Sequence, residues 1–235
     1  MTTRWETTTV NGSPMRVYLG IPDRPRRHPG IIVAQHGSGV DAFLQDVVHR
    51  LHREGYAVAA PELFHRQPEG LGLTERLVLM RDDDLVADIS AAIAVLRGLD
   101  PHLGTLGVVG FCMGGRVSYL AACAIPGFKA AAVFYGGNIL KAWGDGPTAL
   151  ERSEGLDCPL IGFFGAEDKN PSPEDVNLIH QELARLGKWH EFHSYQDTGH
   201  AFLSFGNPDR YRPRAARGAW GELLAFFDDR LWDAA

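Results

Sequence analysis

The sequence lacks the features of several protein classes. Its 235 residues include 23 lysines and arginines against 29 aspartates and glutamates, which gives a formal charge of -6. Such a chain offers no basic field to a phosphate backbone, so we expect no nucleic-acid partner. No apolar run approaches the roughly 20 residues that span a bilayer, and the first ten residues contain no apolar stretch like that of a signal peptide. These absences predict a cytoplasmic protein that does not enter a membrane.

Cysteine is also scarce. The three cysteines, Cys112, Cys123 and Cys158, are odd in number and show no close spacing of the kind that binds metals. This usage fits thiols that a cytoplasm keeps reduced, and it excludes a disulfide framework. Small buried cysteines are common, and we expect Cys123 and Cys158 to be of that kind.

Histidine pairs and one acidic run do not add up to a metal site. His49 and His52 share the face of a predicted helix, but no third ligand lies near them in the sequence. The odd spacing of His190 and His193 on a predicted strand points their side chains to opposite faces. The aspartates at 82–84 open a predicted helix, where carboxylates stabilise the positive end of the helix dipole. We therefore expect no bound metal.

No internal repeat, low-complexity tract or linker divides the chain. Its stretches rich in proline or glycine, at 144–147 and 171–173, are short enough to be loops. A chain of this length buries about 70% of the surface that its unfolded form exposes, so it needs no disulfide or metal to stabilise a core. We expect residues 1–235 to form a single domain.

The pattern of apolar residues alternates between strand and helix. Short runs dense in Val, Ile and Phe predict buried parallel strands at 31–34, 57–60, 106–109, 130–135 and 160–164. Apolar residues at three- or four-residue steps predict helices around 44–51, 85–96, 114–124, 176–186 and 220–231. Further strands are predicted at 4–10 and 15–19, as an antiparallel edge, and at 191–195. This order predicts the α/β class, with a mostly parallel central sheet of about eight strands and helices on both faces.

The strongest functional signal follows the strand at 106–109. Gly110, Cys112 and Gly114 have the form G-x-S-x-G with cysteine in place of serine, which is typical of a nucleophile elbow. Glycines on both sides let the strand turn sharply into a helix and leave the nucleophile exposed at the corner. The amide-rich start of that helix favours a thiolate, the reactive form of cysteine.

An acid and a base follow in the order that this elbow requires. Asp168 comes directly after the strand at 160–164, and His200 comes after the strand at 191–195. Because the carboxyl ends of parallel strands meet at one edge of a sheet, we expect Cys112, Asp168 and His200 to form a triad there. Glu167 is chemically able to replace Asp168.

Backbone amides for an oxyanion hole are also predictable. The segment 36–39 has the sequence His-Gly-Ser-Gly and follows the strand at 31–34, as the corresponding glycine-rich loop does in many lipases and esterases. We assign the two amides to Gly37 and to Met113, the residue after the nucleophile.

Over nearly its whole length the sequence resembles the dienelactone hydrolase family of the α/β-hydrolase superfamily. The resemblance rests on the Gly-x-Cys-x-Gly-Gly elbow at 110–115, on Gly165 with Asp168, and on the Gly-His-x-Phe segment at 199–202. It also includes Gln35 and Gly39, Gly55 and Tyr56, and Pro61 and Leu63. It implies an α/β-hydrolase fold and a Cys-His-Asp triad that opens the lactone of a carboxymethylenebutenolide without metal or organic cofactor.

The chain departs from this family at the substrate. Members acting on dienelactone have a glutamate after the glutamine, and here that residue is His36. An arginine that holds the substrate carboxylate four residues after the histidine is replaced by Ser204. Other candidates are Arg76 and Arg81, and also Arg210, Arg212 and Arg214, although solvated surface arginines are equally consistent with these positions. We expect His36 and Arg81 to contact the substrate, a small ester or lactone.

Two alternatives remain open from the sequence. An acyl-enzyme on a cysteine could pass its acyl group to an acceptor other than water, which would make the protein a thioesterase or acyl transferase. With the glutamate lost, the protein could also be a non-hydrolytic ligand-binding or redox-responsive relative with an oxidisable thiol. The sequence does not predict the oligomeric state.

Overall fold

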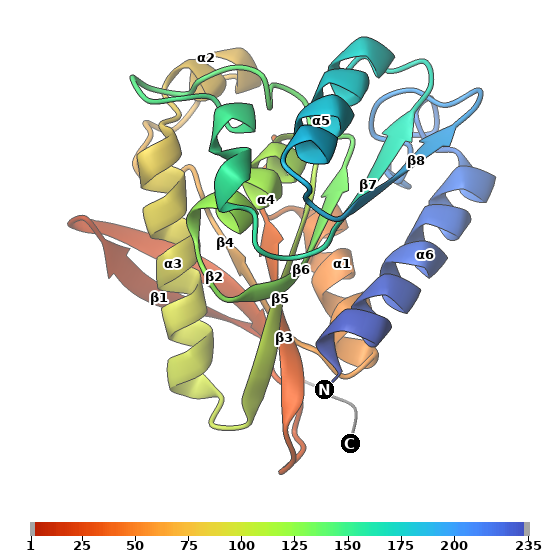
Figure 1. The fold of residues 1–235 in the computed structure, drawn as a ribbon. Helices are drawn as coiled ribbons and strands as arrows, with labels where there is room; N and C mark the ends of the chain where they lie inside the picture. The colour runs from red at the N-terminus through yellow and green to blue at the C-terminus, as the bar shows by residue number, and fades with distance from the viewer. Residues whose placement is uncertain (1–2, 233–235) are drawn as a thin grey trace.

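The computed structural model describes residues 3–232, and its centre is one eight-stranded sheet (Figure 1). The strands lie in the order β1-β2-β4-β3-β5-β6-β7-β8. Strands β3 to β8 are parallel, whereas β1 pairs antiparallel with β2, and β2 with β4. Their bounds are β1 Thr3–Val10, β2 Ser13–Gly20, β3 His28–Ala34, β4 Ala57–Pro61, β5 Leu103–Phe111, β6 Phe128–Phe134, β7 Leu160–Gly165 and β8 His190–Tyr195. The predicted mostly parallel sheet with an antiparallel edge is confirmed.

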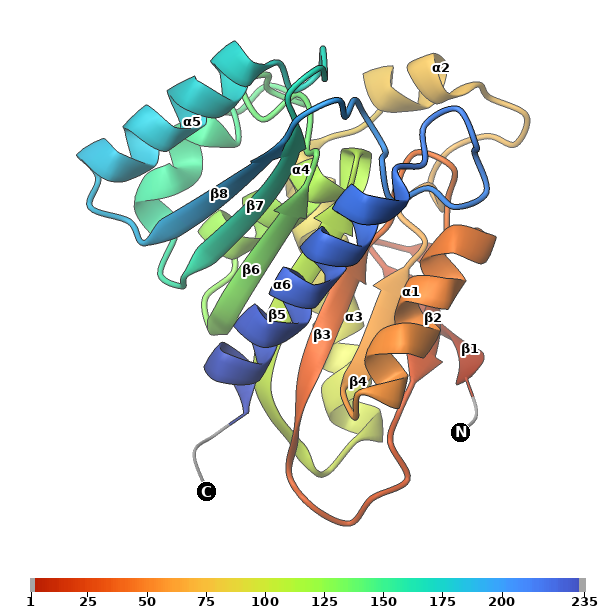
Figure 2. The same ribbon diagram turned by 90° about the vertical axis from the view of Figure 1, so that its right-hand side faces the viewer.

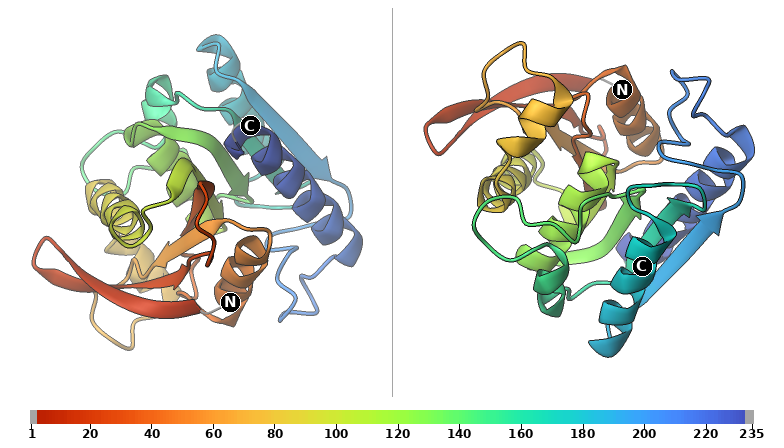
Figure 3. Two further views of the ribbon diagram at one scale, coloured as in Figure 1. Left: turned by 90° about the horizontal axis from the view of Figure 1, so that it is seen from below. Right: turned by 90° about the horizontal axis from the view of Figure 1, so that it is seen from above.

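Helices cover both faces of the sheet. Helices α3 (Asp82–Leu99), α4 (Met113–Ala124) and α5 (Pro173–Arg185) pack with one apolar cluster, and α1 (Ala42–Arg53) and α6 (Pro213–Leu231) pack with the other. Figures 2 and 3 show α1 and α6 together on the face opposite α3. Among the described residues, no helix is both long and apolar enough to cross a membrane.

Burial explains why these strands are recognisable in the sequence. Strand β5 is buried without interruption from Leu106 to Phe111, because helices cover both of its faces. The edge strand β1 instead mixes half-buried and exposed residues, since part of it faces solvent. A continuous apolar run and a broken one therefore distinguish the centre of this sheet from its edge.

Two short helical segments escaped the sequence prediction. Helix α2 (Leu73–Val78) buries none of its residues and lies above the carboxyl edge of the sheet in Figures 1 and 2. The 3-10 helix η1 (Leu150–Gly155) buries only Ser153. Neither segment has the apolar periodicity that identifies a packed helix.

Candidate active site

Cys112 stands at a strained corner between β5 and α4. Its backbone has φ 55° and ψ -120°, a conformation that costs a non-glycine residue free energy and is found mainly at functional sites. A Cβ on Gly110 would lie 1.8 Å from the carbonyl oxygen of Gly114, and one on Gly114 would lie 2.2 Å from that of Ala34. The corner can therefore form only with glycine at both positions, as the nucleophile-elbow pattern predicts.

The structure brings the predicted base and acid to this corner. His200 Nδ1 lies 2.8 Å from Asp168 Oδ2, and His200 lines the same cavity as Cys112, close enough for each to shift the pKa of the other. Asp168 is 5% exposed, and its second oxygen accepts a hydrogen bond from the N–H of Asn170 at 3.0 Å. The rival carboxylate of Glu167 is exposed to solvent. Cys112, Asp168 and His200 thus lie together beyond the carboxyl ends of β5, β7 and β8.

Electrostatics within this chain favour a thiolate-imidazolium pair. Burial by itself raises the pKa of the Cys112 thiol, but the hydrogen bond and charge of His200, together with the N–H of Met113, hold it below its ordinary value. Burial likewise lowers the pKa of His200, and its hydrogen bonds to Asp168 and Cys112 more than compensate, raising that pKa to about 9. Both shifts favour the charged form of the group, and a thiolate is the reactive form of cysteine.

The ring of Tyr135 packs against the imidazole of His200. This residue directly follows β6 with φ 40°, another strained backbone for a side chain of its size, and it is 1% exposed. Its ring meets that of His200 edge to face, with the centroids 5.2 Å apart. Tyr135 holds the plane of the imidazole, a role that the sequence did not indicate beyond its place at the end of a strand.

A cavity of about 360 Å³ opens over the thiol. We call it the Cys112 cavity. Its walls are largely apolar and come from α2, α4 and the loop after β6, through Leu73, Leu77, Met113 and Trp143. Ligand sites commonly combine apolar walls of this kind with a few polar groups that fix orientation.

Two cations supply such polar groups. Lys169 and Arg210 line the Cys112 cavity, and within residues 3–232 neither side chain has an ion-pair partner. The only carboxylate in the lining belongs to Asp168, which is already bound to His200. An anionic group entering this cavity would meet two uncompensated positive charges.

Both predicted substrate ligands lie elsewhere. Arg81 precedes α3 and contacts the exposed Asp145 at 3.2 Å, with its side chain 59% exposed and outside the lining of the Cys112 cavity. His36 lies with Nε2 2.8 Å from Asp41 Oδ1 and packs its ring on Phe43. Asp41 caps α1, so His36 stabilises the start of that helix. Neither side chain lines the Cys112 cavity, because both have partners outside it, and their contact with a substrate stays a prediction.

Of the two predicted oxyanion amides, that of Met113 lies in the Cys112 cavity, whereas Gly37 is outside its lining. Met113 lines the Cys112 cavity, and its N–H points to the sulfur. Gly37 belongs to a tight turn closed by a 3.0 Å hydrogen bond from the Gly39 N–H to the carbonyl of His36. A Cβ added to Gly37 would lie 2.9 Å from Leu73 Cδ1, so α2 covers this glycine.

A buried ion pair fixes the wall that carries Trp143. Arg116 of α4 is fully buried and holds Asp82 with both of its terminal nitrogens. Its guanidinium lies 3.9 Å from the ring centre of Trp143, and its Nε donates to the carbonyl of Asn138. Asp82 therefore does more than complement a helix dipole. It anchors α3 and the loop after β6 to the helix that begins at the thiol.

Comparisons with known proteins identify the family of this chain. Residues 15–231 match the family described as the dienelactone hydrolase family. A Synechocystis protein named "Putative carboxymethylenebutenolidase" is 30% identical over 91% of this chain and 91% of its own length. A Bradyrhizobium protein named "Probable 2-oxo-3-(5-oxofuran-2-ylidene)propanoate lactonase" is 27% identical over 94% and 92%.

A solved structure extends the similarity to three dimensions. The Klebsiella pneumoniae subsp. pneumoniae protein named "Putative Dienelactone Hydrolase" superposes with a TM-score of 0.86 at 28% identity, covering 97% of this chain and 99% of its own. The family match spans the elbow, the acid and the histidine in one segment. The chain therefore belongs to the dienelactone hydrolase family, with the α/β-hydrolase fold.

Proposed function

We propose that this protein hydrolyses a carboxylic ester or lactone through Cys112, with His200 as its base and Asp168 as the acid that orients the imidazole. The observation that carries the proposal is the placement of Cys112 at a nucleophile elbow beside His200, whose imidazole is bound to Asp168 at 2.8 Å. Membership of the dienelactone hydrolase family supports the same reaction type.

The first half of the reaction forms an acyl-enzyme. The Cys112 thiolate attacks the carbonyl carbon, and the amides of Met113 and Gly37 stabilise the oxyanion that develops. Collapse of the tetrahedral intermediate breaks the bond between the carbonyl carbon and the alcohol oxygen, while the imidazolium of His200 donates its proton to that oxygen. An ester loses its alcohol, whereas a lactone keeps the new hydroxyl tethered to the acyl group.

The second half releases the acid. Neutral His200 now removes a proton from water, and the resulting hydroxide attacks the thioester carbon. The second tetrahedral intermediate expels the Cys112 thiolate and leaves a carboxylic acid. Asp168 keeps the imidazole in the tautomer that accepts the proton at Nε2 and stabilises its charge.

The position of His36 bears on which residue activates the thiol in this scheme. With the imidazole of His36 turned towards Asp41 and Phe43, the thiol has His200 as its activating partner in the structure. The thiol pKa is lowered by His200 and by the N–H of Met113, which in this scheme activate the thiol without a glutamate at position 36.

The substrate class follows from the lining of the cavity. Apolar walls fit a small ring or chain, and Lys169 and Arg210 favour a substrate with an anionic substituent near the reacting carbonyl. Dienelactone and the oxofuranylidene lactone in the name of the Bradyrhizobium relative are both lactones with a carboxylate. We therefore propose an anionic lactone or ester as the substrate.

Parallel assays of the purified protein and Cys112→Ala test this function. The substrates are 4-nitrophenyl acetate, which is neutral, and dienelactone, which is anionic. Hydrolysis of both by the wild type, lost in the variant, is the expected result. Hydrolysis of the acetate alone would leave the triad intact and contradict the anionic substrate. Absence of hydrolysis on both would overturn the proposed function.

A further inference from the structure

A second cavity, of about 470 Å³, lies beside the turn at 36–39 that contains Gly37. We call it the Gln35 cavity. It is lined by that turn, by the segment that follows β4 and by α2 with the residues before it. Leu73 is the one side chain that lines both this cavity and the Cys112 cavity. The two spaces therefore meet at Leu73, beside the glycine assigned to the oxyanion hole.

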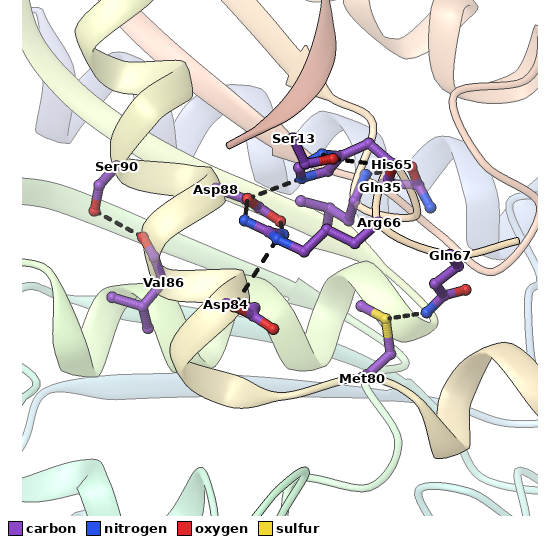
Figure 4. Close-up of polar contacts among 11 residues, drawn as sticks. Ser13, Gln35, His65, Arg66, Gln67, Met80, Asp84, Val86, Asp88 and Ser90 are labelled. Atoms are coloured by element: carbon purple, nitrogen blue, oxygen red, sulfur yellow. Dashed lines mark hydrogen bonds and ion pairs between the residues drawn. The ribbon is translucent and has the colours of Figure 1, made fainter. Parts of the chain in front are cut away.

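One wall of the Gln35 cavity is held rigidly. His65 lies 3.1 Å from Asp88 Oδ1 and 2.9 Å from Ser13 Oγ, and Arg66 donates two hydrogen bonds of 2.7 Å to the same Asp88 carboxylate (Figure 4). Asp88 is fully buried. Gln67 next in the chain contacts the sulfur of Met80. This network fixes the shape of the cavity in advance, and ligand sites are usually preformed in this way.

The lining of the cavity includes one hydrogen-bond donor without a partner among the described residues. Gln35 is 1% exposed, and its Oε1 accepts from the N–H of Leu63, but within the described chain its Nε2 has no partner. Such a buried donor is unfavourable until something accepts from it. The acidic Glu62 in the lining is neutralised by Arg16, at 2.7 Å. The lining also holds Glu69 and Arg76, whose charges are opposite in sign, and the unused donor of Gln35 suits an uncharged oxygen acceptor.

The two cavities are separated by the side chain of Leu73, on the exposed helix α2. Leu73 covers Gly37 and is itself 45% exposed, and α2 buries none of its residues. Gly70, with φ 82°, precedes the helix. Gln67 Nε2 donates a 3.0 Å hydrogen bond to the carbonyl of Arg76 and so ties α2 to the cavity wall, and shortening the Leu73 side chain would join the two cavities without moving the helix.

From this geometry we propose that the Gln35 cavity is a second substrate compartment, which receives an uncharged, oxygen-bearing end of the acyl chain, and that Leu73 limits the length of acyl chain accepted. The inference rests on the proposed hydrolase function. It adds that the enzyme distinguishes a hydroxylated acyl chain from an alkyl chain of the same length. The distinction arises at Gln35, with Ser38 at the mouth of the compartment.

The test measures kcat/KM for 4-nitrophenyl acetate, heptanoate and 6-hydroxyhexanoate, the last two having chains of equal length. Leu73→Ala should raise the ratio of 6-hydroxyhexanoate to acetate about tenfold, because it opens the second compartment. In the same variant the hydroxylated ester should exceed heptanoate about three- to tenfold, the contribution of one neutral hydrogen bond. Gln35→Glu, which keeps an acceptor for Leu63 but removes the donor, should abolish that preference.

Val78→Ala is the matched control, because Val78 lies on the same helix, is 80% exposed and lines neither cavity. Equal ratios in Leu73→Ala and Val78→Ala, or a hydroxyl preference that survives Gln35→Glu, would overturn the compartment. Acetate separates the two proposals, since it needs only the Cys112 cavity. If acetate is hydrolysed but the ratios of kcat/KM are the same in all variants, the second compartment alone is contradicted. If the wild type does not hydrolyse acetate, both proposals are overturned.

Discussion

The carboxylate of Asp168 has both of its oxygens occupied, one by His200 Nδ1 at 2.8 Å and the other by the N–H of Asn170 at 3.0 Å. With two donors fixed on it, this carboxylate cannot turn away from the imidazole. The second ring nitrogen is then left for Cys112, which is the tautomer that a general base requires.

Asp168→Asn should lower kcat on 4-nitrophenyl acetate by about 10³- to 10⁴-fold, because an amide can present its donor to the imidazole and favour the wrong tautomer. Steady-state kinetics measure the loss. Glu167→Gln, a change at the exposed adjacent residue, should stay near the wild-type rate. The reverse pattern would assign the acid to Glu167.

The pH dependence of kcat/KM should be bell-shaped. Activity rises as Cys112 ionises, and this acid limb should lie below the ordinary pKa of a thiol, because His200 and Met113 stabilise the thiolate. It falls as the imidazolium loses its proton, with a pKa of about 9. Asp168→Asn should move the basic limb to lower pH, since Asp168 raises that pKa. A profile that only increases through the ordinary thiol range would contradict the ion pair.

Arg210→Gln should raise KM for dienelactone about tenfold, the effect of losing one charge-assisted hydrogen bond, and leave 4-nitrophenyl acetate nearly unaffected. Added salt should weaken dienelactone binding to the wild type more than to the variant, because exposed charges are screened. Arg81→Gln serves as the control, since Arg81 lies outside the Cys112 cavity. A larger effect from Arg81 would restore it as a substrate ligand.

Asp82→Asn should reduce the free energy of unfolding by about 3–5 kcal/mol, because it leaves Arg116 charged and fully buried without its partner. Denaturant titration measures this change. Asp83→Asn is the matched control, as the neighbouring side chain is 93% exposed and should alter stability by about 0.5 kcal/mol or less. Equal effects of the two substitutions would show that the buried pair contributes nothing specific.

The fold and the triad were predictable because both depend on local patterns. Strands covered on two faces are continuous apolar runs, as in β5, and the elbow needs glycines at fixed offsets from Cys112. The carboxyl ends of parallel strands then place Asp168 and His200 at one edge without further information. Helix α2 lacked any such signal, since none of its residues is buried.

The substrate contacts depended on tertiary structure and were not predictable. His36 lies outside the Cys112 cavity because its ring contacts Asp41 and Phe43. Arg210 lines the cavity because of the path of the loop after Phe202. The pairing of Asp82 with Arg116 spans 34 positions in the sequence. Charge alone marks such residues as candidates, but only the path of the loops selects among them.

The most direct test of the account is to locate the acyl group during turnover. The protein is mixed with 4-nitrophenyl acetate, quenched in acid within milliseconds and digested for mass spectrometry, with Cys112→Ala treated identically. The account predicts one acetyl group on the peptide that contains Cys112, and no acetylation or hydrolysis in the variant. An acetyl group on another residue, or wild-type hydrolysis by Cys112→Ala, would contradict it.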